Sequence, residues 1–204
     1  MAFREALKYG IPPLVLALVA GLAGWHVVAA ILVVAGAFVF YFFRDPERDV
    51  PHEAGAVVSP ADGRVVEVVE EAFDGRPGKR ISIFLSIFNV HVNRSPVKAR
   101  IESVDYRPGK FYAAMRARAS MENEQNVIRL ETGRGPVIVK QIAGWIARRV
   151  LVWKPVGASL ERGERLGMIR FGSRVDLWLP AEARIVVSKG QNVHGGSSVV
   201  AQWS

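Results

Sequence analysis

The 204-residue chain contains no cysteine, which excludes disulfides, thiolate metal sites and a cysteine nucleophile. Histidine is scarce as well: the four imidazoles show no metal-ligand spacing, and we expect no metal site. Acidic residues number 19 against 27 lysines and arginines, so the formal net charge is +8. This surplus indicates an anionic partner, which could be a nucleic acid, an anionic lipid or an acidic substrate.

Two functional signatures are also missing. No nucleic-acid-binding motif is present and the basic residues are spread along the chain, so we do not expect nucleic acid as a partner. The nucleophile elbow G-x-S-x-G is absent from the sequence, which argues against a membrane serine hydrolase that would use Ser59 or Ser173. What the sequence does contain must therefore identify the anionic partner.

A run without formal charge, residues 11–43, predicts a membrane-associating segment. One span needs about 20 apolar residues, so the run is too long for one untilted helix and slightly short for two full spans with a turn. Gly21, Gly24 and Trp25 fall in its middle, where a hairpin can turn at the membrane interface. We assign residues 1–50 to this segment. A buried core helix is the alternative, and whether the segment spans the bilayer or enters one leaflet stays open.

After residue 50 the pattern changes to short apolar runs broken by glycine and proline, which is typical of strands. Many short strands favour a β-sandwich or barrel. Glycine-flanked motifs at residues 157–163 and 190–196 resemble the hairpins of lipoyl and biotinyl carriers. We therefore predict a mainly β domain over residues 51–204, built of lipoyl-like barrel-sandwich hairpin modules, with one short helix over residues 112–119.

Two polar residues of this domain are candidates for a site. Asp62 lies in SPADGRV, where an ordinary Asp–Gly turn is the alternative. His91 lies in FLSIFNVHVNRSP, and strand alternation puts it on one face with Asn89 and Asn93. A polar stripe within an apolar strand indicates a lined site, whereas a lone histidine in a strand is more often structural.

The Gly172–Ser173 pair interrupts a regular strand pattern in RLGMIRFGSRVDLWLP. A β-bulge is one explanation. The other is that this peptide bond is a chemical site, because glycine lets its carbonyl turn toward the serine hydroxyl. Attack by Oγ would convert the amide to an ester, and β-elimination would leave dehydroalanine, which hydrolyses to a pyruvoyl group. Such a group forms Schiff bases and accepts electrons.

Six stretches resemble the phosphatidylserine decarboxylases, in particular their short prokaryotic, archaeal-type and pyruvoyl-dependent form. From about residue 38 onward they read YFFRDPER, SPADGRV, FLSIFNVHVNRSPV, SMENEQN, AGWIARRV and GERLGMIRFGSRVDLWLP. The resemblance implies a proenzyme that cuts itself at the Gly–Ser bond of a motif written LGS(T/S). It also implies that the new pyruvoyl group decarboxylates phosphatidylserine to phosphatidylethanolamine and CO2.

Carried onto this sequence, the resemblance makes Ser173 the pyruvoyl precursor and Gly172–Ser173 the scissile bond. Asp62 matches the aspartate of the family's S-P-x-D-G. His91 matches the first histidine of an H-x-x-H pair, but the second position is Arg94. In longer members an Asp-His-Ser relay, with that second histidine as base, is thought to drive the cut. The base is therefore open here, and His91 is our candidate.

The resemblance further implies two products of the cut, a beta chain of residues 1–172 and an alpha chain of residues 173–204. The substrate amine would form a Schiff base with the pyruvoyl carbonyl, and His91 would return a proton after CO2 leaves. No metal and no pyridoxal phosphate would take part. Four residues are candidates to hold the lipid phosphate: Asn93, Arg94, Arg148 and Arg149. For the two arginines of ARRV, ordinary surface charge is the alternative.

The implied partners are the phospholipid substrate, the membrane and the two chains of one precursor, and a homo-oligomer stays open. Basic residues on both sides of the apolar run favour a hairpin with both ends in the cytoplasm. The enzyme would therefore lie at the inner membrane with its catalytic domain on the cytoplasmic side. The alternative function is a non-catalytic, membrane-anchored lipoyl-like carrier or adaptor, for which Lys189 is the modifiable lysine.

Overall fold

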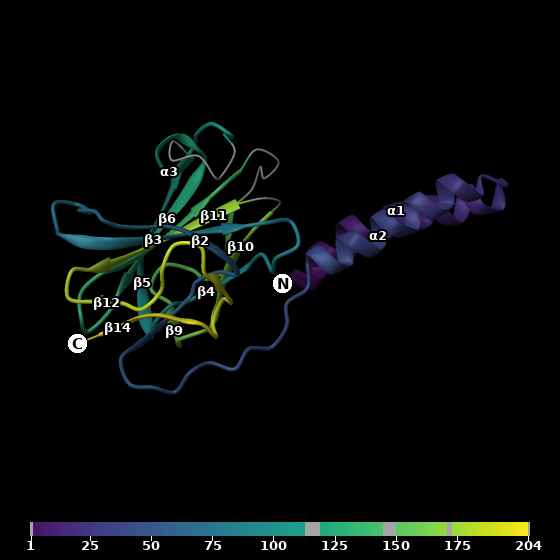
Figure 1. The fold of residues 1–204 in the computed structure, drawn as a ribbon. Helices are drawn as coiled ribbons and strands as arrows, with labels where there is room; N and C mark the ends of the chain where they lie inside the picture. The colour runs from purple at the N-terminus through teal and green to yellow at the C-terminus, as the bar shows by residue number, and fades with distance from the viewer. Residues whose placement is uncertain (1, 113–118, 145–149, 171–172, 204) are drawn as a thin grey trace. The chain divides into compact units, whose positions relative to one another are not determined.

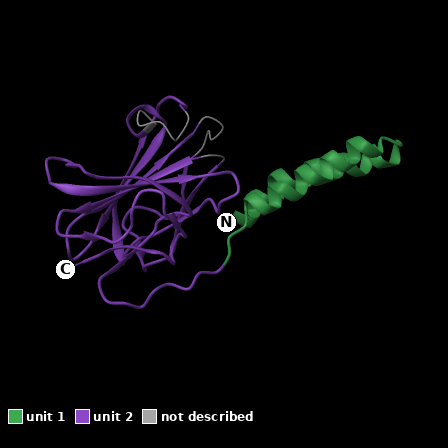
Figure 2. Ribbon diagram, in the orientation of Figure 1, with its two compact units in different colours: residues 1–46 green, residues 47–204 purple. Residues whose placement is uncertain are grey.

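A computed structural model describes residues 2–112, 119–144, 150–170 and 173–203. The chain forms two compact units, residues 1–46 and residues 47–204, which are coloured separately in Figure 2. Three predicted site residues, Gly172, Arg148 and Arg149, lie outside the described residues. Most of the helix predicted over residues 112–119 also lies outside them.

The first unit is a pair of helices, α1 (Ala2–Leu22) and α2 (His26–Phe42). A turn at Gly24, with a φ of 83°, joins them, so the predicted hairpin is confirmed. The helices approach closely at two glycines: a Cβ on Gly10 would lie 2.6 Å from the Phe40 ring, and one on Gly36 would lie 2.6 Å from Leu14. Small residues allow such contact between apolar helices.

The outer surface of this helical pair is apolar. Leu18 and Leu22 of α1 are 65% and 83% exposed, and Val27 of α2 is 75% exposed. By length and composition α1 is able to cross a membrane, while α2 is a shorter apolar helix of 17 residues. A helix that is apolar all round is a helix of a membrane or of a large core, and these side chains are not in a core.

The second unit is mainly β, as predicted (Figure 1). Its elements are β1 (Ala56–Val58), β2 (Gly63–Glu70), β3 (Gly78–Leu85), β4 (Val92–Arg94), β5 (Ala99–Arg107), α3 (Ala119–Glu122), β6 (Gln125–Glu131), β7 (Val137–Ile142), β8 (Val150–Val152), β9 (Ser159–Leu160), β10 (Arg165–Ile169), β11 (Ser173–Pro180), β12 (Arg184–Ile185), β13 (Asn192–Val193) and β14 (Val199–Gln202).

All the paired strands of these sheets are antiparallel. One sheet has eight strands in the order β13-β2-β3-β11-β7-β6-β5-β9, and two have three strands, β4-β10-β8 and β1-β14-β12. The two glycine-flanked motifs provide β9 and β13, which are the opposite edges of the large sheet. That the two motifs belong to related hairpin modules, like the comparison with lipoyl carriers, stays a prediction.

Strand β11 lies between β3 and β7 and is buried along its whole length. Alternation sends Val175, Leu177 and Leu179 into the main hydrophobic core, and the residues between them to the opposite face of the sheet. Pairing on both sides fixes the register: Ser173 lies opposite Leu85 of β3. The last strand before the predicted cut, β10, belongs to a different sheet.

Candidate active site

Ser173, the first residue of β11, is fully buried, and its hydroxyl oxygen has no hydrogen-bond partner within the described part of the chain. Leaving a buried hydroxyl without a partner costs about 1–3 kcal/mol. Native structures satisfy nearly all such groups, so an exception calls for an explanation. One explanation is that the hydroxyl is kept available to attack the preceding carbonyl.

His91 reaches the same region from another sheet. The β3 strand ends at Leu85, the chain turns, and β4 begins at Val92, directly after His91. The backbone carbonyl of His91 accepts a hydrogen bond of 3.3 Å from the amide of Ile169, the last residue of β10. The β3–β4 and β10–β11 connections therefore lie beside each other at both ends, because Leu85 pairs with Ser173 and His91 bonds Ile169. His91 and Ser173 are the residues at which these two connections end.

The hydrogen bond of the His91 ring determines which nitrogen is basic. Nδ1 lies 2.9 Å from the backbone oxygen of Asn89, and a carbonyl can only accept, so Nδ1 carries the proton. In the neutral imidazole, Nε2 is then the nitrogen that can take up a proton. The side chain is fully buried. This arrangement suits a general base, and a general base is the group that the predicted cut needs.

The structure corrects one part of the His91 prediction. Asn89 does not share a strand with His91, because its Oδ1 accepts hydrogen bonds from the amide and the hydroxyl of Ser86 (2.9 and 2.8 Å). A side chain that bonds the nearby backbone competes with strand pairing. The predicted polar stripe is instead a turn over residues 86–90, whose Asn89 carbonyl holds the imidazole.

Asn93, predicted to bind substrate, lies in β4 and is fully buried. Its Oδ1 accepts a hydrogen bond of 2.9 Å from Gln141 of β7, whose own Oε1 accepts one of 3.1 Å from Asn126 of β6. Gln141 lies opposite Val175, two residues after Ser173. The interior between the two sheets is thus polar next to Ser173, although the rest of the core is aliphatic.

The Asp62 carboxylate contacts two basic side chains and one backbone amide. Nη2 of Arg48 donates to both of its carboxylate oxygens (3.0 and 2.9 Å), and the amide of Gly195 donates to Oδ1 (2.8 Å). His194 Nδ1 lies 3.5 Å from Oδ2. None of the described contacts of Asp62 is to His91. Asp62 therefore joins the segment before the β domain to the segment after β13.

Arg94, which replaces the second histidine of H-x-x-H, is also buried, at 6% exposure. Its Nη1 donates a hydrogen bond of 3.1 Å to the backbone oxygen of Gly163, and its amide donates to Pro60. The first bond holds the turn before β10 against β4, and the second joins β4 to the segment between β1 and β2. Histidine at this position would serve as a base, whereas a guanidinium cannot be deprotonated in a protein.

The comparisons with known proteins agree on one family. The model of the phosphatidylserine decarboxylase family matches residues 35–201. The chain belongs to this family. It is 47% identical over 177 residues to a phosphatidylserine decarboxylase proenzyme of Symbiobacterium thermophilum, with 85% of this chain and 82% of that protein covered. Proteins of the same name from Ralstonia nicotianae and Geotalea uraniireducens are 48% and 45% identical, covering 81% and 89% of this chain and 78% and 87% of their own lengths.

As a member of the phosphatidylserine decarboxylase family, the chain departs from the family's serine motif at Arg174, and the structure shows what this arginine contacts. Arg174 is 2% exposed; its Nε donates to Asp176 (2.7 Å), and its Nη2 donates to Glu67 (3.0 Å) and Ser82 (2.6 Å). Arg80 contacts the same three side chains. A buried ionic network thus fixes the residue that follows Ser173.

Removing Arg174 should destabilise the fold strongly. Arg174→Ala leaves Asp176 and Glu67 with Arg80 but removes the buried guanidinium and its hydrogen bonds to them, and a hydrogen bond to a charged group contributes about 1.5–3 kcal/mol to the free energy of unfolding. We would measure it by urea denaturation in a Ser173→Ala background, where one uncut chain unfolds. Arg129→Ala is the control, because its partner Asp74 is exposed and such pairs contribute about 1 kcal/mol or less. Equal losses in the two variants would contradict the assignment.

The same prediction has a pH dependence. Burial raises the pKa of Glu67, but hydrogen bonds and charges from Arg80 and Arg174 outweigh it and lower that pKa below its ordinary value. Because the folded-state pKa is lowered, this contribution to stability is present above the unfolded carboxyl pKa of about 4.3 and is lost as the pH falls through the folded value. The difference in the free energy of unfolding between Arg174→Ala and its parent should therefore become smaller as the pH is lowered.

Sequence reasoning missed two residues of the region, His194 and Arg48. Both meet Asp62, but no local spacing relates them to it: His194 follows Asp62 by more than a hundred positions and Arg48 precedes it across two prolines. The pairing of β13 with β2, which sets Val193 opposite Gly63, brings His194 to Asp62. Gly63 itself is required, because a Cβ there would lie 2.1 Å from the Phe84 carbonyl oxygen.

Proposed function

We propose that this protein is a self-processing, pyruvoyl-dependent decarboxylase that converts phosphatidylserine to phosphatidylethanolamine and CO2. The observation that carries the proposal is the buried Ser173 hydroxyl, without a hydrogen-bond partner among the described residues, in a chain of the phosphatidylserine decarboxylase family. Family membership also favours an enzyme over the carrier or adaptor alternative.

The proposed cut uses groups of this chain only. Nε2 of His91 takes up the hydroxyl proton of Ser173, and Oγ attacks the carbonyl carbon of Gly172. The peptide nitrogen leaves as an amine and an ester forms. Loss of the Ser173 Cα proton breaks the Cβ–Oγ bond and frees residues 1–172 with a carboxylate end. Water then replaces the nitrogen of the remaining dehydroalanine, and ammonia departs.

A pyruvoyl group at position 173 supplies a ketone that accepts the substrate amine and draws electrons from the carbon that loses CO2. The residues of this chain would orient the substrate at that group and return a proton to it. Ser173 lies at the end of a strand that is paired on both sides, so the new terminus has little freedom. His91 Nε2 is the group that we propose returns a proton to the substrate carbon.

Strand pairing would hold the two products of the proposed cut together. Residues 173–204 provide β11, β13 and β14, of which β11 pairs with β3 and β7, β13 with β2 and β14 with β1 of the longer chain. Separating them would expose the core face of β11, so we propose that the active protein consists of both chains. The apolar surface of α1 and α2 supports attachment to the membrane, and we propose the cytoplasmic side of the inner membrane.

Mass analysis of the purified, denatured protein tests this function. We expect two fragments, residues 1–172 and residues 173–204, with the shorter one blocked at its N terminus. It should be lighter than the serine-ended peptide by one molecule of ammonia. A cut at the other Gly–Ser bond, Gly196–Ser197, would be recognised by its eight-residue product. A single intact chain in active material would refute the proposal.

A further inference from the structure

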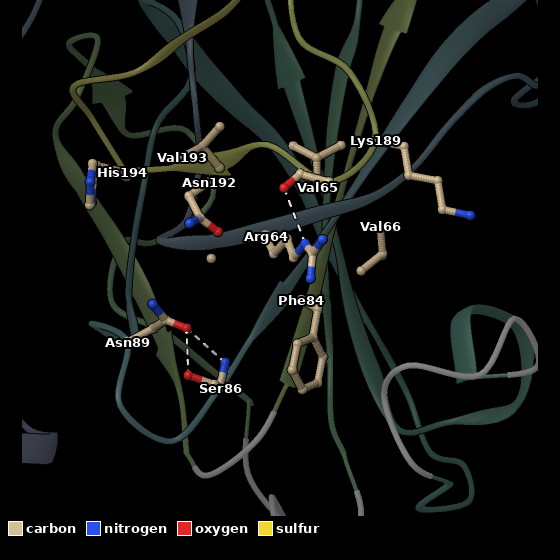
Figure 3. A pocket seen from close by; sticks show the side chains of 12 residues that line it. Arg64, Val65, Val66, Phe84, Ser86, Asn89, Lys189, Asn192, Val193 and His194 are labelled. Carbon is tan, nitrogen blue, oxygen red and sulfur yellow. Dashed lines mark hydrogen bonds between the residues drawn. The ribbon is translucent and has the colours of Figure 1, made fainter.

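A pocket of about 1000 Å³ lies beside the candidate active site, and no sequence motif had indicated it (Figure 3). It lies on the face of the eight-stranded sheet that carries Arg64 and Phe84, because their neighbours Val65 and Ile83 point into the core. Residues 189–194, in the segment that ends in β13, form the opposite part of the lining. Both products of the proposed cut therefore contribute to it.

The charged side chains of the lining are both cations. Arg64 and Lys189 line the pocket together with His194, which lies beside the Asp62 carboxylate (3.5 Å), and none of the described lining residues is acidic. In the described structure the only hydrogen bond of the Arg64 side chain runs from Nε to the Gly190 oxygen (3.1 Å), which leaves both Nη groups available. Lys189 is exposed and has no anionic partner among the described residues. Figure 3 shows Arg64 between His194 on one side and Lys189 on the other.

The rest of the lining is partly apolar and partly able to form hydrogen bonds. Val66 and Phe84 provide apolar side chains, and Ser86, Asn89 and Asn192 the polar part. Arginine and lysine next to apolar surface suit an amphiphilic anion, with a phosphate at the guanidinium and carbon chains against Val66 and Phe84. A small inorganic anion would leave most of this volume unfilled.

Two connections link the pocket to the end of β11 at which Ser173 lies. Phe84 pairs across the sheet with Arg174, the residue after Ser173, whereas Ser173 and its partner Leu85 lie on the core face of the same strand ends. On the other side, Asn89 lines the pocket and its backbone oxygen holds the His91 ring. A ligand in the pocket thus contacts the turn that positions the proposed base, at the strand end where the new terminus would lie.

Resting on the proposed function, we propose that this pocket binds the phosphodiester of the phospholipid substrate, with Arg64 and Lys189 as its cations. The pocket thereby sets the serine end of the headgroup toward position 173 while the glycerol and first acyl carbons lie on the apolar side. Arg64 is the central group because its planar guanidinium can give two parallel hydrogen bonds to a phosphate.

The test uses the full-length, processed protein and a short-chain, water-soluble phosphatidylserine, so that attachment to a membrane surface does not enter. We would measure CO2 release for Arg64→Gln, Lys189→Gln and the double variant. Each single change should raise KM about tenfold and the double change more, with kcat within about twofold of the parent, since hydrogen bonds to charged groups have about this effect. Processing, followed by mass, should be complete in all three.

Matched controls are Arg184→Gln and Lys98→Gln. Arg184 is also exposed with one side-chain hydrogen bond, to Gln202, and Lys98 is an exposed lysine away from this pocket. An equal rise in KM in the controls would show a general charge effect and overturn the proposal. The proposal would also be overturned if the processed Lys189→Gln and Arg64→Gln variants both kept the KM of the parent.

A second measurement separates a lipid phosphate from a free one. Inorganic phosphate should compete with the lipid in the parent and lose this effect in the double variant. If phosphate competed in the parent while the variants left the KM for the lipid unchanged, the pocket would take free phosphate only and the proposal would fail. Failure of the proposed function looks different: the parent itself would be uncut or would release no CO2.

Discussion

Ser173→Ala is expected to leave one chain of 204 residues that releases no CO2 from phosphatidylserine. The hydroxyl is both the nucleophile and the oxygen that is eliminated, and alanine supplies neither. No other residue can replace it, since the new carbonyl arises from the backbone of the residue that carries this oxygen. Gel mobility and mass measure the cut, and CO2 release measures turnover.

Ser197→Ala is the matched control, because Ser197 also follows a glycine but its side chain is partly exposed. We expect this variant to be cut and active like the parent. A processed Ser173→Ala protein would contradict the assignment of the site, whatever its activity. An uncut Ser197→Ala protein would move the site to the C-terminal segment.

The same substitution has an expected effect on stability. The Ser173 hydroxyl is buried with no hydrogen-bond partner among the described residues, so its removal relieves an unsatisfied polar group. Ser173→Ala should therefore be at least as stable in urea as an uncut precursor that keeps the serine. Ordinary substitutions of buried residues destabilise, and an unchanged or raised stability would mark a position at which function, and not packing, determines the residue.

The sequence predicted those parts of the molecule that depend on local pattern. The turn near Gly24 follows from glycine in an apolar run, and the alternation of Val175, Leu177 and Leu179 follows from the strand period. The interruption at Gly172–Ser173 was visible for the same reason, since it breaks that period. Local pattern also failed once: it read residues 86–91 as a continued strand, because nothing in the period reveals that Asn89 bonds back to Ser86.

Other parts depend on which strands pair, and no local pattern contains that information. Nothing in the local pattern indicates that Arg174 is buried: β11 is an inner strand, and Asp176 and Glu67 of β2 supply the charges beside the guanidinium. Asp62 was assigned from the S-P-x-D-G match alone, and the pairing of β13 with β2 places His194 beside it. The contacts made by Glu67 and by His194 join segments that are distant in the sequence.

Substitution of His91 should separate the role of the ring from the role of its hydrogen bond. His91→Ala removes both. His91→Asn keeps an N–H donor near the position of Nδ1, so the bond to the Asn89 oxygen can persist while the basic Nε2 is lost. If Nε2 moves protons, both variants should slow the cut, and turnover per processed chain should fall by about 10²–10⁴-fold.

A structural role for His91 predicts a different order. In that case His91→Asn would process and turn over like the parent, and only His91→Ala would be impaired, with a lower urea midpoint. His52→Ala, which removes a histidine of the same domain away from β4 and β11, controls for loss of an imidazole elsewhere.

Added imidazole should restore part of the rate of processing and turnover to His91→Ala, because the deleted ring leaves room for it, and should leave the rates of His91→Asn unchanged. Arg94 is unable to act as a base. Normal processing in both His91 variants would therefore mean that a group other than residues 91 and 94 takes the proton of Ser173.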